Sequence, residues 1–421
     1  MRVAWFCLLA SLIPARAQTD DATTLANRAE QLIRSGDKAG AVAALKQAAA
    51  LSPTTAQSED RIGFLYAVID DKPAAEEHFE KSISLDSNYA PAHYHFGVVL
   101  WQSGDRENAI TQLETATKLA PGVFDYLYHL GSSYMQIGKY DLATAHLKQA
   151  VAVDPRKANA WEALGQALQQ EGDLSAAVNA YENAVNNDAA NDSLRNTYAY
   201  LLIETREADR GIAESQKVLS HNPSDTSALL NIGYAYLKKG EFQHASQAYQ
   251  QALAIDPKLP AAHYNLGIAL KMEDKIELAQ AQYRDAIQLD PSLAVAHYSL
   301  GITYWQLGDF PKAIGEMRAA LQTRPEYPEA HYMLGILLKQ NGDLDGALAE
   351  LKESIRLDPT TPGPYNTIGQ ILRIKGDKQG SEEAFATGAR LKREKEANLS
   401  NTLDQGMRGG FEPKPLAGGP R

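Results

Sequence analysis

The chain has 421 residues, of which 44% are hydrophobic, 8% aromatic and 22% charged, and its formal net charge is −11. This composition can supply a sizeable buried core, and it excludes a chain that is disordered throughout. The acidic balance and the lack of any run of five or six basic residues argue against broad nucleic-acid binding, because an acidic surface repels phosphate backbones.

The first seventeen residues have the pattern of a secretory signal peptide. Arg2 gives a positive start, residues 3–13 are almost wholly apolar, and Ala15-Arg16-Ala17 forms a small-x-small cleavage site. About eleven apolar residues are too few to cross a bilayer, which needs about 20. We therefore expect cleavage after Ala17, with an uncleaved N-terminal anchor as the alternative, and a protein located in the bacterial periplasm or outside the cell.

The single cysteine, Cys7, lies inside this signal segment. The mature chain, which would begin with a short segment at residues 18–21, would therefore contain no cysteine. This suits an exported protein and excludes a cysteine nucleophile and thiolate metal ligands.

Glycine recurs at intervals of 34 residues, or of 68 where Ala199 takes its place, and alanine and proline columns keep the same period. The glycines are Gly63, Gly97, Gly131, Gly165, Gly233, Gly267, Gly301, Gly335 and Gly369. Eleven repeats then tile residues 22–395 without insertion or deletion: 22–55, 56–89, 90–123, 124–157, 158–191, 192–225, 226–259, 260–293, 294–327, 328–361 and 362–395. Such a period predicts stacked units rather than one globular core.

Each repeat has the pattern of two helices, as residues 294–327 illustrate. Leu300, Tyr304 and Leu307 follow helical spacing in the first helix, which Gly308 ends. Asp309 is a suitable N-cap for a second helix, and Pro325 ends it. Because one hairpin cannot bury its apolar side alone, neighbouring repeats must stack.

These columns resemble the tetratricopeptide repeat family. Leu130-Gly131 with Tyr134, and Leu300-Gly301 with Tyr304, match its first helix, and Ala245, Tyr249, Ala252 and Pro257 match its second. The resemblance covers residues 22–395. It implies an all-α, right-handed superhelical α-solenoid of about eleven helix-turn-helix repeats, with a concave groove that holds peptides or partner helices.

The sixth repeat and the C-terminal end depart from the pattern. In residues 192–225, Ala199, Arg206, Gly211, Ser215 and Val218 replace the usual small, aromatic and turn residues, which indicates either tolerated drift or a joint between two half-arrays. The last helix should continue as a capping helix to about Asn398. Residues 396–421 would then hold the end of that helix and a disordered tail rich in glycine and proline.

No motif for catalysis, cofactor binding or metal binding stands out. His93, His263, His297 and His331 occupy one column, but equivalent residues of stacked repeats lie about 10 Å or more apart, whereas zinc ligands converge at about 2 Å from one ion. The sequence therefore predicts no catalytic residue, no cofactor and no metal site. The lysine and arginine partners of the family's two-carboxylate clamp are also missing beside Asn231 and Asn265.

The predicted protein-binding groove is lined by side chains at offsets 0, 4, 7 and 8 of the first helices, which share one helix face. The residues predicted to line it are Tyr94, Val98, Trp101, Tyr234, Tyr264, Ile268, Tyr298, Ile302, Trp305, Tyr332 and Ile336; Lys271, Met272 and Lys339 belong to the same sets. Contiguous exposed apolar surface marks interaction sites. The alternative is that superhelical curvature buries part of this stripe.

The sequence thus predicts a non-enzymatic, exported scaffold that binds partner peptides or helices. The alternative is a non-catalytic accessory subunit of envelope machinery, such as polysaccharide export, pilus assembly or outer-membrane assembly. Neither hypothesis includes a nucleic-acid partner or a direct membrane span.

Overall fold

A computed structural model describes residues 20–51 and 54–404, and in these ranges the chain forms helices and no strand. The helices are α1 (Asp20–Arg34), α2 (Lys38–Ala49), α3 (Ala56–Val68), α4 (Lys72–Leu85), α5 (Ala90–Ser103), α6 (Arg106–Leu119), α7 (Phe124–Gln136), α8 (Tyr140–Val153), α9 (Ala158–Glu171), α10 (Leu174–Asn187), α11 (Asp192–Glu204), α12 (Ala208–His221), α13 (Thr226–Lys239), α14 (Phe242–Ile255), α15 (Pro260–Met272), α16 (Ile276–Leu289), α17 (Ala294–Gln306), α18 (Phe310–Thr323), α19 (Pro328–Gln340), α20 (Leu344–Leu357), α21 (Pro362–Ile374) and α22 (Lys378–Asp404). The predicted all-α solenoid is confirmed.

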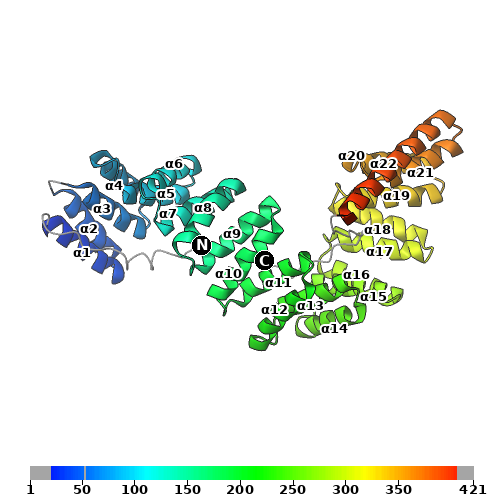
Figure 1. Cartoon of the computed structure of the whole chain (residues 1–421), viewed down its shortest axis with the longest axis horizontal. Helices are drawn as coiled ribbons and strands as arrows, with labels where there is room; N and C mark the ends of the chain where they lie inside the picture. The colour runs from blue at the N-terminus through cyan, green and yellow to red at the C-terminus, as the bar shows by residue number, and fades with distance from the viewer. Residues whose placement is uncertain (1–19, 52–53, 405–421) are drawn as a thin grey trace. The chain divides into compact units, whose positions relative to one another are not determined.

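Consecutive helices pack as pairs, such as α5 with α6 and α17 with α18, and second helices also contact the first helix of the next pair, as α8 does with α9 and α14 with α15 (Figure 1). From α3 onward the first helices begin at residues 56, 90, 124, 158, 192, 226, 260, 294, 328 and 362. The helical hairpins therefore keep the 34-residue period of the sequence, and each one buries its apolar side against its neighbours.

The turn inside each hairpin needs a residue in the left-handed region. Glycine occupies this position in eight hairpins, for example Gly308 with φ 79°, whereas Asp70, Arg206 and Asp274 adopt φ 63°, 70° and 62°. An aspartate then caps many of the second helices; the Asp343 carboxylate accepts a hydrogen bond of 2.9 Å from the amide of Gly346.

The glycine column lies where the two helices of a hairpin approach most closely. A Cβ atom on Gly335 would lie 2.7 Å from Cγ of Leu351, and one on Gly233 would lie 2.5 Å from Cε1 of Tyr249. Both distances are shorter than real Cβ contacts, so glycine is required for the observed separation of the helices.

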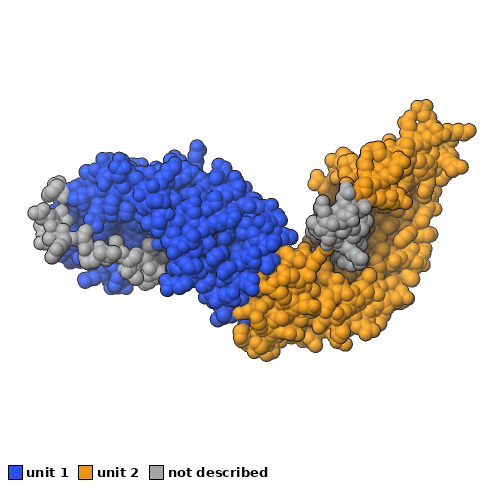
Figure 2. Space-filling view, in the orientation of Figure 1, with its two compact units in different colours: residues 1–194 blue, residues 195–421 orange. Residues whose placement is uncertain are grey.

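The helices group into two compact units, residues 1–194 and residues 195–421 (Figure 2). The division falls in α11, within the irregular sixth repeat; the joint suggested for that repeat stays a prediction. At the C-terminal end, α22 continues past Asn398 to Asp404, so the helix covers part of the segment expected to be disordered. The signal segment, including Cys7, and residues 405–421 lie outside the described residues.

Candidate protein-binding surface

Several first helices contact the first helix of the next repeat directly, as α3 does with α5, α13 with α15, and α19 with α21. Side chains at equivalent positions of successive first helices form a row, with one residue from each repeat. The predicted groove residues all belong to such rows, but the structure divides them into buried and partly exposed members.

In unit 2, five of the predicted residues are partly exposed and lie on two successive first helices. Tyr298, Ile302 and Trp305 lie at helical spacing on α17, and Tyr332 and Ile336 occupy the equivalent positions on α19. All except Ile336 pack on one side against the core cluster that contains Leu334 and Leu338. We call these five residues the α17–α19 face; it presents aromatic and β-branched surface to solvent.

Three other predicted residues of unit 2 are buried. Tyr234, Tyr264 and Ile268 are only 3%, 1% and 6% exposed. The hydroxyl of Tyr234 donates a hydrogen bond to Glu204, and the ring of Tyr264 packs 5.9 Å from that of Tyr283. These side chains support the stack from inside, as the curvature alternative anticipated.

Aromatic side chains around the α17–α19 face pack against one another and against a guanidinium group. The ring centroids of Tyr298 and Tyr327 lie 5.2 Å apart, and the guanidinium of Arg324 lies 4.7 Å from the Tyr327 ring. Burial raises the pKa of Tyr298 to about 12. Its hydroxyl is therefore neutral at physiological pH and can donate or accept a hydrogen bond.

Unit 1 presents a different surface on its first helices. Tyr94 is buried and its ring lies 4.6 Å from that of Tyr126, whereas Val98 and Trp101 are partly exposed. Nearby polar pairs include the Asp60 carboxylate, 2.8 Å from Nδ1 of His95. A shallow pocket farther along is lined mainly by glutamines, Gln136, Gln166, Gln169 and Gln170, together with Met135 and Tyr140. Of the predicted groove residues in unit 1, Val98 and Trp101 therefore remain partly exposed.

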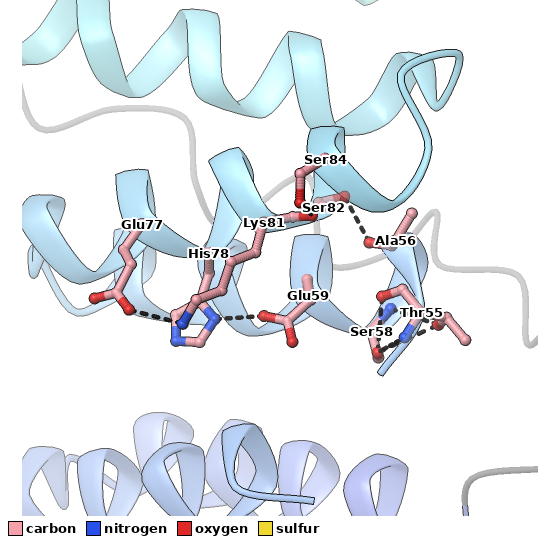
Figure 3. Close-up of polar contacts among 9 residues, drawn as sticks. All are labelled: Thr55, Ala56, Ser58, Glu59, Glu77, His78, Lys81, Ser82 and Ser84. Atoms are coloured by element: carbon pink, nitrogen blue, oxygen red, sulfur yellow. Dashed lines mark hydrogen bonds and ion pairs between the residues drawn. The ribbon is translucent and has the colours of Figure 1, made fainter. Parts of the chain in front are cut away.

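The histidine column connects the two helices of a hairpin. Nδ1 of His331 lies 2.6 Å from the Glu350 carboxylate and that of His297 lies 2.7 Å from Glu316, each partner 19 residues later. In the second repeat the order is reversed, with His78 on α4 and Glu59 on α3, 2.6 Å apart and buried (Figure 3). His78, His297 and His331 therefore each have a partner within their own repeat. The residues that the structure describes contain no cluster of metal-ligating side chains.

The two asparagines at a position of the family's two-carboxylate clamp are buried. Asn231 and Asn265 are 1% and 0% exposed, and Nδ2 of Asn231 donates a 2.9 Å hydrogen bond to the carbonyl oxygen of Asn196. Asn231 thus links α13 to α11, and neither buried asparagine can receive a ligand at the surface. Within residues 20–51 and 54–404, none of the helices has the length and apolar character needed to cross a bilayer.

Signatures described as TPR repeat or tetratricopeptide repeat match residues 94–143, 131–172, 158–191, 233–274, 273–308 and 298–362. The chain belongs to the tetratricopeptide repeat family. Proteins of this family bind other proteins or peptides and are generally non-catalytic, so the chain is a protein–protein interaction scaffold.

No curated protein matches the chain. Solved structures with a similar arrangement of helices include yeast Tom70, with 12% identity over 91% of this chain and 98% of Tom70 and a TM-score of 0.47. A tetratricopeptide repeat protein from Parabacteroides merdae ATCC 43184 has 17% identity over 59% and 98%, with a TM-score of 0.49. MamA from Desulfovibrio magneticus RS-1 has 22% identity over 40% and 97%, with a TM-score of 0.38. Similarity at this level assigns no partner to the present chain.

Proposed function

We propose that this tetratricopeptide repeat protein is exported and holds a peptide or helical segment of another protein in a groove lined by the α17–α19 face. The observation that carries the proposal is the partial exposure of Tyr298, Ile302, Trp305, Tyr332 and Ile336, all but Ile336 of which pack against one core cluster. Tyrosine and tryptophan supply large contact areas with few rotatable bonds and often dominate binding energy. No catalytic step is part of this function.

The proposed mode of binding follows from the shape of the side chains. The rows on α17 and α19 offer apolar contacts at helical spacing, which a partner helix or an extended segment can match with its own apolar residues. The isoleucines give the face a rigid, branched surface, and the partly exposed tyrosine hydroxyls provide hydrogen bonds for orientation.

Export is proposed from residues 1–17 alone. Expression of the full chain in a bacterium, followed by fractionation and N-terminal sequencing, tests it. We expect the mature protein outside the cytoplasm to begin at Gln18. An intact N-terminus on cytoplasmic protein would contradict export.

Binding is tested by capture from an envelope extract with the wild-type chain and with an Ile302→Asp, Trp305→Ala variant. We expect a protein retained by the wild type to be lost from the variant. Leu278→Asp is a matched control, because Leu278 is an apolar residue of the second helix α16 that is 56% exposed. Circular dichroism must show all three proteins folded. Equal capture by all three would place binding elsewhere on the chain.

A further inference from the structure

A row of basic side chains runs beside the α17–α19 face. Lys271 on α15, Lys339 on α19 and Arg373 on α21 occupy the same repeat position, which Trp305 occupies on α17. This position follows that of Ile268, Ile302 and Ile336 by three residues, so both rows lie on the same side of their helices. We call the three cations the basic row; it lies in a chain whose net charge is −11.

The three cations of the basic row have no carboxylate partner among the described residues. In the part of the protein that the structure describes, none of its three members forms an ion pair, whereas Lys239, Lys275 and Lys312 lie 2.8, 2.7 and 2.6 Å from carboxylate oxygens. Lys339 instead donates a hydrogen bond of 2.6 Å to the amide oxygen of Gln370. These cations therefore remain available to an anionic partner group.

Lys271 is the least solvated member of the row. Its side chain is partly buried one turn beyond the buried Ile268, and desolvation lowers its pKa with no carboxylate to oppose the shift. A cation that has lost part of its hydration without gaining a counter-ion gains more from a new carboxylate than a fully hydrated one does. The ammonium group of Lys271 is thus favourably placed to pair with a carboxylate of a bound ligand.

The spacing of the row favours dispersed carboxylates over a single phosphate. Adjacent stacked helices are about 10 Å apart, so Lys271 and Lys339, two repeats apart, are separated by about 20 Å. One phosphate or one chain terminus cannot reach both cations. Carboxylate side chains can do so on a polypeptide, about 13 residues apart in a helix or about 6 residues apart in an extended segment.

We infer that unit 2 selects an acidic, apolar polypeptide segment: its apolar side chains pack on the α17–α19 face while its aspartate or glutamate side chains pair with Lys271, Lys339 and Arg373. This inference rests on the proposed function and adds the chemistry of the partner. Carboxylates that complement an unpaired row fix the register of the segment and disfavour basic segments by charge repulsion.

The test is selection of peptides from a random 16-residue phage library on the purified full-length chain. Enriched sequences are synthesised with amidated C-termini, so that no terminal carboxylate contributes, and their affinities are measured by fluorescence anisotropy. The variants are Ile302→Asp, the double variant Lys271→Met, Lys339→Met, and Lys352→Met. Lys352 is a matched control because it is an exposed lysine of second helix α20 without an ion pair in the described chain.

We expect enriched peptides to combine aliphatic or aromatic residues with an excess of aspartate and glutamate. Ile302→Asp should abolish their binding, the double lysine variant should weaken it about tenfold or more, and Lys352→Met should leave it unchanged. Two outcomes would overturn the inference and leave the proposed groove intact. In the first, the enriched peptides require Ile302 but are neutral or basic. In the second, acidic peptides bind the double lysine variant as tightly as the wild type. Failure to obtain any peptide that depends on Ile302 would overturn the groove itself.

Discussion

Gly211 on α12 lies directly against the carbonyl oxygen of Ala199 on α11, and this pair reverses the arrangement found in other repeats. A Cβ atom on Gly211 would lie 2.9 Å from that oxygen and 2.5 Å from Cγ1 of Ile203. In repeats two to five and seven to ten the first helix carries glycine at this approach and the second carries alanine. In the sixth repeat the small residues have exchanged places, and the fully buried Ser215 replaces the usual large residue. The two helices of this repeat therefore still approach closely, with the glycine on the second helix instead of the first.

We predict that Gly211→Ala lowers the free energy of unfolding by about 1–3 kcal/mol, because the added methyl group requires the helices to separate. Urea denaturation followed by circular dichroism measures the change. Gly315→Ala is the control: Gly315 is an exposed residue within α18 whose Cβ would meet nothing within 4 Å. That variant should gain about 0.5–1 kcal/mol from helix propensity. Equal destabilisation by both substitutions would refute the steric explanation.

Tyr249 and Tyr181 occupy the same repeat position but differ in hydrogen bonding. The Tyr249 hydroxyl is buried without a partner in the described structure, and burial raises its pKa well above the usual value. The Tyr181 hydroxyl donates a 2.8 Å hydrogen bond to Gln169. Removing an unsatisfied polar group is favourable, whereas removing a satisfied one is costly. We predict that Tyr249→Phe stabilises the protein by about 1 kcal/mol and that Tyr181→Phe destabilises it by a similar amount, measured by thermal and urea unfolding. A loss of stability in Tyr249→Phe would contradict this.

The buried environment of His129 predicts a loss of stability in acid. Desolvation lowers its pKa in the folded state, and the nearby Asp125 only partly opposes the shift. The unfolded chain therefore binds a proton more readily than the folded chain, so stability falls as pH decreases through the unfolded value of about 6.5. Below the lowered pKa of the folded state, His129 is protonated in both states and the stability falls no further.

We expect His129→Gln to reduce this dependence. When the pH is lowered from 7.5 to 5, the urea midpoint of the wild type should fall further than that of the variant. His244→Gln controls for histidine content, because His244 is an exposed histidine of α14 in unit 2. A constant difference across this pH range would show that His129 does not contribute.

The pair His331 and Glu350 links α19 to α20, and Nε2 of His331 also lies 2.9 Å from the carbonyl oxygen of Pro325 in the preceding repeat. His331→Leu should cost about 1 kcal/mol because both hydrogen bonds are lost. Glu350→Gln should cost less than about 0.5 kcal/mol. Glutamine already fills the partner position in two other repeats, where the oxygens of Gln112 and Gln282 lie 2.7 and 2.8 Å from Nδ1 of His93 and His263. A large loss in Glu350→Gln, measured by urea unfolding, would show that the carboxylate charge is essential.

The sequence determined the repeat, the helix pairs and the general class of function. A period of 34 residues with glycine, alanine and proline columns has few physical solutions, because each column marks a close approach, a turn or a helix end that any stacked hairpin needs. Side chains at helical spacing likewise predicted a face of the first helices for partner binding, which stays a prediction.

Tertiary structure decided which residues of that face reach the surface. Tyr264 and Tyr298 hold the same position in adjacent repeats, yet Tyr264 is 1% exposed while Tyr298 remains partly exposed. Exposure depends on the side chains of the neighbouring repeat and on local curvature, which no periodicity within one repeat encodes. The same reason explains the basic row: Lys271 and Lys339 are visible in the sequence, but only the packed helices reveal that no carboxylate of the described chain neutralises them.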